Sequence, residues 1–119
     1  FTPIDFQQHK IKKSGNRFNL ELENTTDIAL TLGKAKSVKQ LLVGFALETD
    51  NETGNATEKL RKKNFDFIVL NSLNDKNAGF GFDTNKITII DKFNNIDNFG
   101  LKTKEEVATD ILTKIISLL

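Results

Sequence analysis

Residues 41–71 read LLVGFALETDNETGNATEKLRKKNFDFIVLN and carry the pattern that decides the fold. The apolar run at residues 41–46 has no polar interruption, which is typical of a strand covered on both faces, so we expect a central parallel strand there. Residues 65–70 form a second, largely apolar strand, in which Asp66 is the one polar residue. Two such strands joined through a helix within about 30 residues make a βαβ unit, whose strands are parallel.

The segment between the two strands has the features of a helix. Thr49 is followed three residues later by Glu52, which is the spacing of a capping box, so we expect the helix to begin there. Ala56 and Leu60 lie four residues apart on the side that should be buried, and the helix should end near Asn64.

Upstream of this unit, the sequence predicts an extended arm and a short helix. Residues 18–23 alternate apolar and polar side chains, which is the period of a half-exposed strand. Residues 10–13, followed by a turn at 14–16, complete a hairpin with that strand. Good cap residues at 25–27 then precede residues 28–36, which we expect to be helical.

Downstream, the chain returns to the sheet and ends in a helix. Residues 71–85 form a polar loop whose length suggests a functional role, residues 86–91 a strand, and residues 94–100 a turn region. Thr103 and Glu106 have the spacing of a second capping box. The apolar stripe of the final helix consists of Val107, Ile111, Ile115 and Leu118.

This order of elements predicts an α/β fold: a three-layer, Rossmann-like, mostly parallel sheet with an antiparallel β arm. The 119 residues fit one domain, with the arm and dimerisation strands at 1–24 and the α/β core at 25–119. Only two or three central strands are present, so we expect a partial sheet, the C-terminal portion of a larger domain. The first residue, Phe1, is not Met, which agrees with a preceding segment.

Composition excludes several classes of function. Lys and Arg number 17 against 16 Asp and Glu, so the net charge is +1, and nucleic-acid binding is not expected. There is no Cys and one His, which excludes a disulfide, a thiol nucleophile and a Cys-built zinc site. The apolar runs are too short to span a bilayer and no signal peptide is visible, so we expect a soluble, cytoplasmic protein without a membrane partner.

Ligands of parallel sheets bind beyond the carboxyl ends of the strands, which directs attention to residues 45–50 and to Asn71 onward. Glu48 and Asp50 follow the first strand. They either act as a catalytic acid and base or as metal ligands, or they only stabilise the N-terminus of the next helix through its dipole. Lys59 and Lys63, four residues apart, either bind phosphate together or form a solvated basic face.

Five stretches, taken together in order and spacing, resemble one family over essentially the whole chain. That family is the phosphopantothenate-cysteine ligase (phosphopantothenoylcysteine synthetase) domain of bacterial bifunctional coenzyme A biosynthesis proteins. The stretches are KIKK at 10–13, TDI at 26–28, VGFALET at 43–49, KLRKKNFDFIVLN at 59–71, and AGFG at 78–81 with DTNK at 83–86.

The resemblance implies a two-step reaction in coenzyme A biosynthesis. The carboxylate of 4'-phosphopantothenate attacks the α-phosphate of CTP and releases pyrophosphate, and the amine of L-cysteine then displaces CMP from the acyl-cytidylate to give phosphopantothenoylcysteine. Mg²⁺ accompanies CTP. FMN is implied only where the ligase is fused to an upstream decarboxylase domain.

The resemblance also implies site residues. Lys10 becomes a catalytic and CTP-binding lysine, because a fixed cation near the α-phosphate offsets the charge of the transition state. The other residues implied in CTP binding are Asp27, Ile28, Ala29, Leu30, Phe45, Lys59 and Lys63. Candidates for lining the same pocket are Ala46, Asn71 and Phe80. No metal ligand is assigned.

In the family, a phosphate-binding loop, an asparagine and an acidic CTP-binding residue lie before the position of Phe1. We therefore expect these 119 residues not to catalyse ligation alone, and we expect a homodimer through the arm at 10–23. One alternative is a non-catalytic nucleotide-binding or dimerisation module. A phospho-acceptor receiver domain is disfavoured, because its site needs an aspartate where this chain has Asn71.

Overall fold

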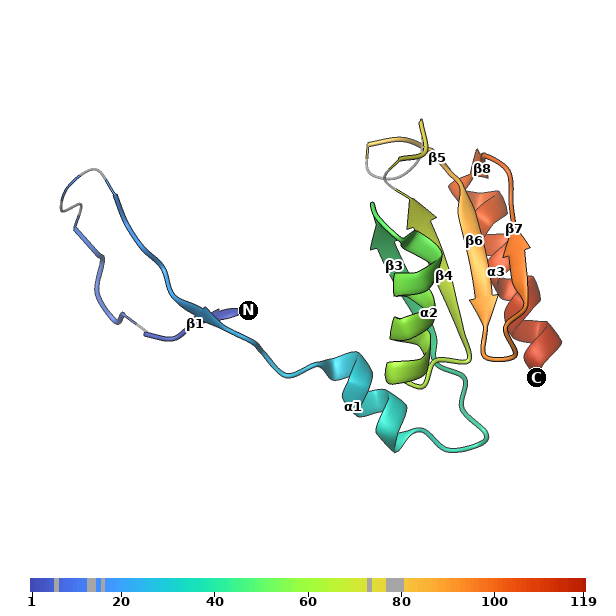
Figure 1. Cartoon of the computed structure of the whole chain (residues 1–119), viewed down its shortest axis with the longest axis horizontal. Helices are drawn as coiled ribbons and strands as arrows, with labels where there is room; N and C mark the ends of the chain where they lie inside the picture. Colours follow the sequence, from blue (N-terminus) through green and yellow to red (C-terminus); the bar gives the residue numbers. More distant parts are fainter. Residues whose placement is uncertain (6, 13–14, 16, 73, 77–80) are drawn as a thin grey trace.

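A computed structural model describes residues 1–5, 7–12, 15, 17–72, 74–76 and 81–119. Figure 1 shows an extended arm, residues 1–24, projecting from an α/β body, residues 25–119. The molecule measures 56 × 37 × 25 Å, and its radius of gyration is 18.6 Å. A compact chain of this length would have a radius of gyration of about 13–14 Å. The projecting arm accounts for the difference.

The central sheet has four strands in the order β3-β4-β6-β7. Their bounds are β3 Val43–Glu48, β4 Phe67–Ser72, β6 Ile87–Asp91 and β7 Ile96–Asn98. The β3–β4 pair is parallel, whereas β4–β6 and β6–β7 are antiparallel. The predicted α/β class is confirmed, with a mixed sheet in place of a mostly parallel one. The strand expected at the centre, β3, lies at the edge.

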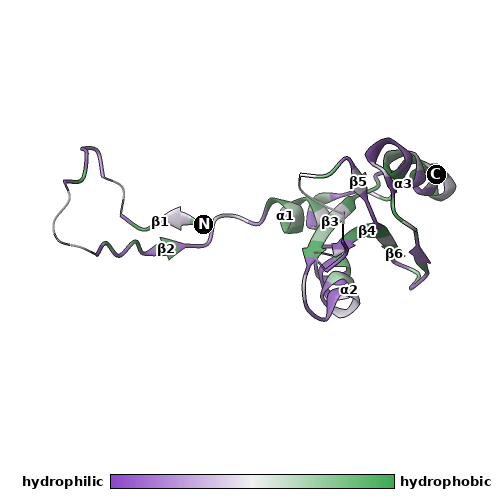
Figure 2. Ribbon diagram, turned by 90° about the horizontal axis from the view of Figure 1, so that it is seen from above, coloured by the Kyte–Doolittle hydropathy of each residue, from purple (hydrophilic) through white to green (hydrophobic). Residues whose placement is uncertain are grey.

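Helices cover both faces of the sheet, which confirms the three layers. α2, Glu52–Lys62, lies on one face and α3, Lys104–Leu118, on the other (Figures 1 and 2). The core beneath α2 contains Ala46, Ala56, Leu60, Phe65, Ile68, Leu70 and Ile90. The core beneath α3 contains Phe67, Val69, Ile87, Ile89 and Val107, with Ile111, Ile115 and Leu118 packed against it, so the predicted stripe of α3 is confirmed.

The two predicted capping boxes have opposite outcomes. At α3, Glu106 N donates to Thr103 Oγ1 at 3.2 Å and Thr103 N donates to Glu106 Oε2 at 2.9 Å, as predicted. At α2 the prediction is wrong, because the N-cap is Asn51, in a left-handed conformation with φ 42° and without a side-chain cap. Glu52 instead accepts a hydrogen bond from Ser72 Oγ at 2.5 Å, across the helix–sheet interface.

The helix α1, Ile28–Ala35, begins at the N-cap Asp27, close to the predicted bounds. It packs closely on the end of α2, where a Cβ on Gly33 would stand 1.8 Å from the carbonyl oxygen of Lys63. Asn64 Nδ2 donates to the Gly33 carbonyl at 2.8 Å. A glycine at position 33 therefore allows the backbones of α1 and of the α2 terminus to touch.

Two predicted regions differ from the structure. The predicted turn at 94–100 contains β7, whose three residues are exposed at the far edge of the sheet. In the arm, only β2, Leu22–Glu23, is a strand within the predicted 18–23. It pairs antiparallel with β1, Thr2–Pro3, and not with the predicted segment 10–13, of which the described residues 10–12 form no strand. A further two-stranded sheet joins β5, Thr84–Asn85, to β8, Lys102–Thr103. In the described ranges, no helix is long and apolar enough to cross a membrane.

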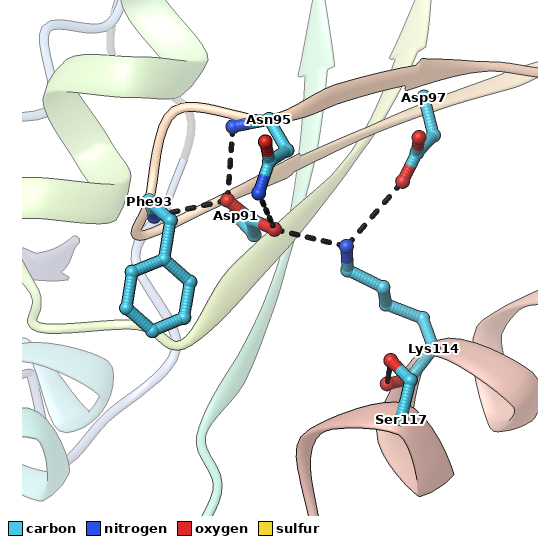
Figure 3. A network of polar contacts seen from close by, with 6 residues as sticks. All are labelled: Asp91, Phe93, Asn95, Asp97, Lys114 and Ser117. Carbon is cyan, nitrogen blue, oxygen red and sulfur yellow. Dashed lines mark hydrogen bonds and ion pairs between the residues drawn. The ribbon is translucent and has the colours of Figure 1, made fainter.

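Two buried aspartates hold the layers together. Asp91, at the end of β6, accepts hydrogen bonds from the backbone amides of Phe93 and Asn95 and from the Asn95 side chain, at 2.9–3.0 Å. Its carboxylate also pairs with Lys114 of α3 at 2.9 Å (Figure 3). Asp66, just before β4, pairs with Lys36 at 2.7 Å and Lys92 at 2.8 Å.

Candidate functional site

The N-terminus of α1 and the end of α2 meet through an ion pair. Asp27 Oδ1 accepts a hydrogen bond from Leu30 N at 3.0 Å, and Asp27 Oδ2 lies 3.1 Å from Lys63 Nζ. The backbone hydrogen bond from Leu30 and then the bond from Lys63 lower the pKa of Asp27, so this carboxylate is charged at neutral pH. The structure therefore brings two of the predicted groups together: residues 27–30 and Lys63.

Lys59 lies one helical turn before Lys63 and also has a carboxylate partner. Its Nζ is 2.5 Å from Glu48 Oε1, at the end of β3. The Glu48 side chain is 11% exposed, and Asn55 Nδ2 donates to its other oxygen at 3.4 Å. Both predicted phosphate-binding lysines thus carry a carboxylate counter-ion.

The two β3 residues of the predicted site point to opposite faces of the sheet. Ala46 is 4% exposed and lies in the core beneath α2. Phe45 is 67% exposed, as expected for the neighbouring residue of a strand at the edge of the sheet. The structure therefore does not bring the Phe45 ring to the face that carries Lys59 and Lys63.

The remaining predicted residues are dispersed. Asn71 lies near the end of β4, where its Oδ1 accepts a hydrogen bond from Asn85 Nδ2 at 2.6 Å. Lys10 is exposed in the arm, which extends away from the body (Figure 1). Phe80 lies outside the described residues. Lys10 is thus apart from the paired lysines of α2 in a single copy of the chain.

The structure has a cavity of about 480 Å³ at the carboxyl end of β4, which was not predicted from the sequence. Its polar lining comes from α2, from β4 and the residues after it, and from β6 and β7. The lining residues are Glu52, Thr53, Leu70, Ser72, Asn74, Asp75, Lys86, Thr88, Asn98 and Phe99. The length of the 71–85 loop and the rule that ligands bind at carboxyl strand ends pointed to this region, but not to the partners from α2 and β7.

Hydrogen bonds connect the walls of this cavity. Asn74 Nδ2 donates to Glu52 Oε1 at 2.8 Å and to the Thr49 carbonyl at 2.8 Å. Lys86 Nζ lies 2.8 Å from Asp75 Oδ1, and Thr88 Oγ1 donates to Asn98 Oδ1 at 2.9 Å. Among the described residues, no group of three or more His, Cys, Asp and Glu side chains is arranged to hold a metal ion.

Comparison with known proteins agrees with this architecture. The family described as "DNA/pantothenate metabolism flavoprotein C-terminal domain" matches residues 1–119. The chain belongs to this family. One family relative, "Cysteine/Cysteine sulfinic acid decarboxylase" of an unknown prokaryotic organism, is 59% identical over 118 residues, which are 99% of this chain and 33% of that protein.

Other relatives carry a different name. The "Coenzyme A biosynthesis bifunctional protein CoaBC" of Bacillus subtilis strain 168 is 42% identical over 118 residues, which are 99% of this chain and 29% of that protein. The protein of the same name from Haemophilus influenzae is 36% identical over 109 residues, or 92% of this chain and 27% of that protein. The chain thus spans about a third of the length of the curated relatives it matches.

Two solved structures confirm the fold. A crystal structure of the C-terminal domain of the coenzyme A biosynthesis bifunctional protein CoaBC matches with a TM-score of 0.67 and 45% identity, over 81% of this chain and 43% of that one. The DNA/pantothenate metabolism flavoprotein from Streptococcus pneumoniae matches with a TM-score of 0.64 and 27% identity, over 84% and 43%. The resemblance stated from the sequence motifs is confirmed.

Proposed function

We propose that this chain supplies part of the site for CTP-dependent ligation of 4'-phosphopantothenate with L-cysteine, a step of coenzyme A biosynthesis that yields phosphopantothenoylcysteine, CMP and pyrophosphate. The observation that carries the proposal is the Asp27–Lys63 pair, which joins the α1 N-terminus to the basic end of α2. Backbone amides and cations meet there, and both favour an anion. The names of several relatives, which describe coenzyme A biosynthesis, agree with this assignment.

In the proposed reaction, the chain's own residues bind and orient the nucleotide. Lys59 and Lys63 release Glu48 and Asp27 and pair with phosphate oxygens, which offsets the negative charge that develops as pyrophosphate leaves. The amides of residues 28 and 29 donate to acceptor atoms of the nucleotide, whereas the Leu30 amide keeps its hydrogen bond to Asp27 Oδ1. The residues before Phe1 in the family supply the rest of the site.

Mg²⁺ in this proposal arrives with the triphosphate. A Mg²⁺ ion is usually held by one or two carboxylates together with substrate phosphates. Asp27 and Glu48 are the carboxylates beside the proposed phosphate position, and they become free when their lysines turn to phosphate. We assign no FMN contact to this chain; FMN belongs to the proposal only with a fused decarboxylase domain.

Lys10 enters the proposal through a second copy of the chain. The arm carries Lys10 away from its own body, so in a homodimer joined through residues 10–23 the arm of one copy supplies Lys10 to the other. We place this reaction in the cytoplasm.

The test is CTP binding to the 119-residue chain, measured by isothermal titration calorimetry. We expect Lys63→Gln to weaken CTP binding roughly 10- to 100-fold, because a charge-assisted hydrogen bond contributes about 1.5–3 kcal/mol. Lys104→Gln removes an exposed lysine on the opposite face of the sheet and should leave binding unchanged. Equal CTP binding by wild type and Lys63→Gln would remove Lys63 from the site.

The alternative function is a non-catalytic nucleotide-binding or dimerisation module, which differs from the ligase in that it forms no product. With CTP, 4'-phosphopantothenate, L-cysteine and Mg²⁺, we expect the 119-residue chain alone to form no phosphopantothenoylcysteine. Adding the upstream half of a family ligase should restore product. If product fails to form with that half while CTP still binds, the module is the correct description.

A further inference from the structure

We propose that the cavity at the carboxyl end of β4 binds the amino-acid substrate, with its ammonium group on Glu52 and its carboxylate on Lys86. This inference rests on the proposed ligation, which needs an amine as second substrate. The cavity volume of about 480 Å³ lies within the range of small-molecule sites.

Glu52 is held in place for such a role. Its Oε1 accepts hydrogen bonds from Ser72 Oγ at 2.5 Å and from Asn74 Nδ2 at 2.8 Å. These two donors come from the end of β4 and from the residues that follow it, whereas Glu52 comes from the first turn of α2. A carboxylate has about four acceptor positions, so capacity remains for an ammonium group.

Lys86 and Asp75 form a second polar pair on the cavity wall. Their charged atoms are 2.8 Å apart, with the side chains 48% and 28% exposed. An amino acid in its zwitterionic form can replace this ion pair. Its carboxylate pairs with Lys86, and its ammonium group lies near the carboxylates of Glu52 and Asp75. The apolar lining, Leu70 and Phe99, offers a surface for a short uncharged side chain.

The charge of the cavity lining distinguishes the cavity from the proposed nucleotide-binding site. Its lining has two carboxylates, Glu52 and Asp75, against one ammonium group, Lys86, so it repels a triphosphate and attracts an ammonium group. Glu52 and Lys59 lie on the same helix, about 10 Å apart along its axis at 1.5 Å per residue. Lys63 lies eleven residues from Glu52, or about 16 Å along the same axis, so the activated carboxyl group has to extend from the lysines toward the cavity. The bound ammonium group must lose a proton before its nitrogen attacks that carboxyl group, and Glu52 is the adjacent acceptor for this proton.

The test is a titration of the ¹⁵N-labelled 119-residue chain with L-cysteine under reducing conditions, followed by NMR. We expect saturable shifts of the amides of Ser72, Asn74, Thr88 and Asn98. Ethylamine, which has only the amine, should shift the amides near Glu52. Propionate, which has only the carboxylate, should shift those near Lys86. Absence of saturable shifts with L-cysteine would overturn the proposal.

Two variants and two controls make the test specific. Glu52→Gln keeps the shape of the side chain and should weaken L-cysteine and ethylamine binding at least tenfold. Lys86→Gln should weaken L-cysteine at least tenfold while ethylamine is retained, so the test does not depend on one variant folding. Glu58→Gln, an exposed carboxylate on the same helix, and Lys104→Gln should change neither ligand. Unaltered L-cysteine binding by Lys86→Gln, or by a folded Glu52→Gln, would contradict the assignment.

A CTP titration of the same sample separates the two proposals. CTP shifts at residues 28–30 and 63 without L-cysteine shifts in the cavity would overturn this inference and leave the proposed function standing. L-cysteine shifts without any CTP binding would instead overturn the nucleotide assignment and support the cavity.

Discussion

Asp91 shows how the charge of one buried side chain contributes to the stability of the fold. Its carboxylate is 2% exposed, and burial alone would raise its pKa, but the hydrogen bonds from Asn95, Lys114 and Phe93 outweigh burial and lower the pKa to about 2. Contact with Asp91 outweighs burial at Lys114 as well, and the pKa of Lys114 is raised. Both charges are therefore favoured in the folded protein.

This network predicts acid sensitivity. Because the pKa of Asp91 is lower folded than unfolded, its contribution is fully present above about pH 5 and is lost as the pH falls toward 2, for a total of about 2 kcal/mol. Urea unfolding at several pH values measures it. In Asp91→Asn, this part of the pH dependence should disappear.

The same variant should also be less stable at neutral pH. Asp91→Asn leaves the Lys114 charge without its buried partner, so we expect a loss of about 3 kcal/mol in the free energy of unfolding. Asp97→Asn is the matched control, since Asp97 is 51% exposed and lies 3.4 Å from the same lysine. An equal loss in the two variants would show that burial of Asp91 is not the cause.

At the level of elements, the position of α1 depends on Gly33. In Gly33→Ala, the added methyl group would meet the Lys63 carbonyl oxygen at 1.8 Å, so α1 has to move away from α2. We expect a loss of about 1–3 kcal/mol by urea unfolding, despite the better helix propensity of alanine.

The shift should also reach the proposed nucleotide site. The Asp27–Lys63 pair spans the same helix contact, so CTP binding to Gly33→Ala should weaken together with stability. Gly100→Ala is the control, because a Cβ there meets no atom within 4 Å. If Gly33→Ala were as stable as wild type and bound CTP equally well, α1 would not depend on this close contact.

The elements that the sequence predicts well are those whose signals are local. The start of α3 was predictable because Thr103 and Glu106 bond each other. The spacing of Thr49 and Glu52 gave a wrong prediction of a capping box, because Glu52 accepts a hydrogen bond from Ser72, twenty residues away in the sequence. β7 escaped prediction because its residues, Ile96–Asn98, are exposed and two of them are polar, so they show no buried-strand pattern.

In the candidate site, too, local features were predictable from the sequence and tertiary contacts were not. The motifs pointed to residues 27–30, Lys59 and Lys63, and Glu48 was named as a candidate as well, but no local pattern predicted that Asp27 and Glu48 pair with the two lysines across the fold. The edge position of β3 and the opposite directions of Ala46 and Phe45 follow from tertiary pairing, which no local pattern encodes. The cavity needed four separate segments to meet, so only its neighbourhood could be predicted.

At the scale of the whole molecule, the arm exposes apolar side chains without covering them in the chain itself. Phe18, Leu20 and Leu22 are 66%, 56% and 47% exposed. Exposed apolar side chains in a row mark an association surface, and we predict that the chain forms a dimer through them.

Sedimentation equilibrium measures this association. Leu20→Asp should raise the dimer dissociation constant at least tenfold, because each copy loses an apolar contact and gains a desolvated charge. Val38→Ser, at a fully exposed position of the body, should leave it unchanged. A wild-type chain that stays monomeric at high concentration would exclude the dimer.

Only residues 24–27 connect β2 of the arm to α1, and the last of them is the N-cap Asp27. Four residues span at most about 14 Å, so the strand and the helix cap cannot move far apart. Whatever immobilises the arm therefore also restricts where the first turn of α1 begins. By thermodynamic linkage, an arm contact that changes nucleotide affinity by some factor must itself be strengthened or weakened by nucleotide by the same factor.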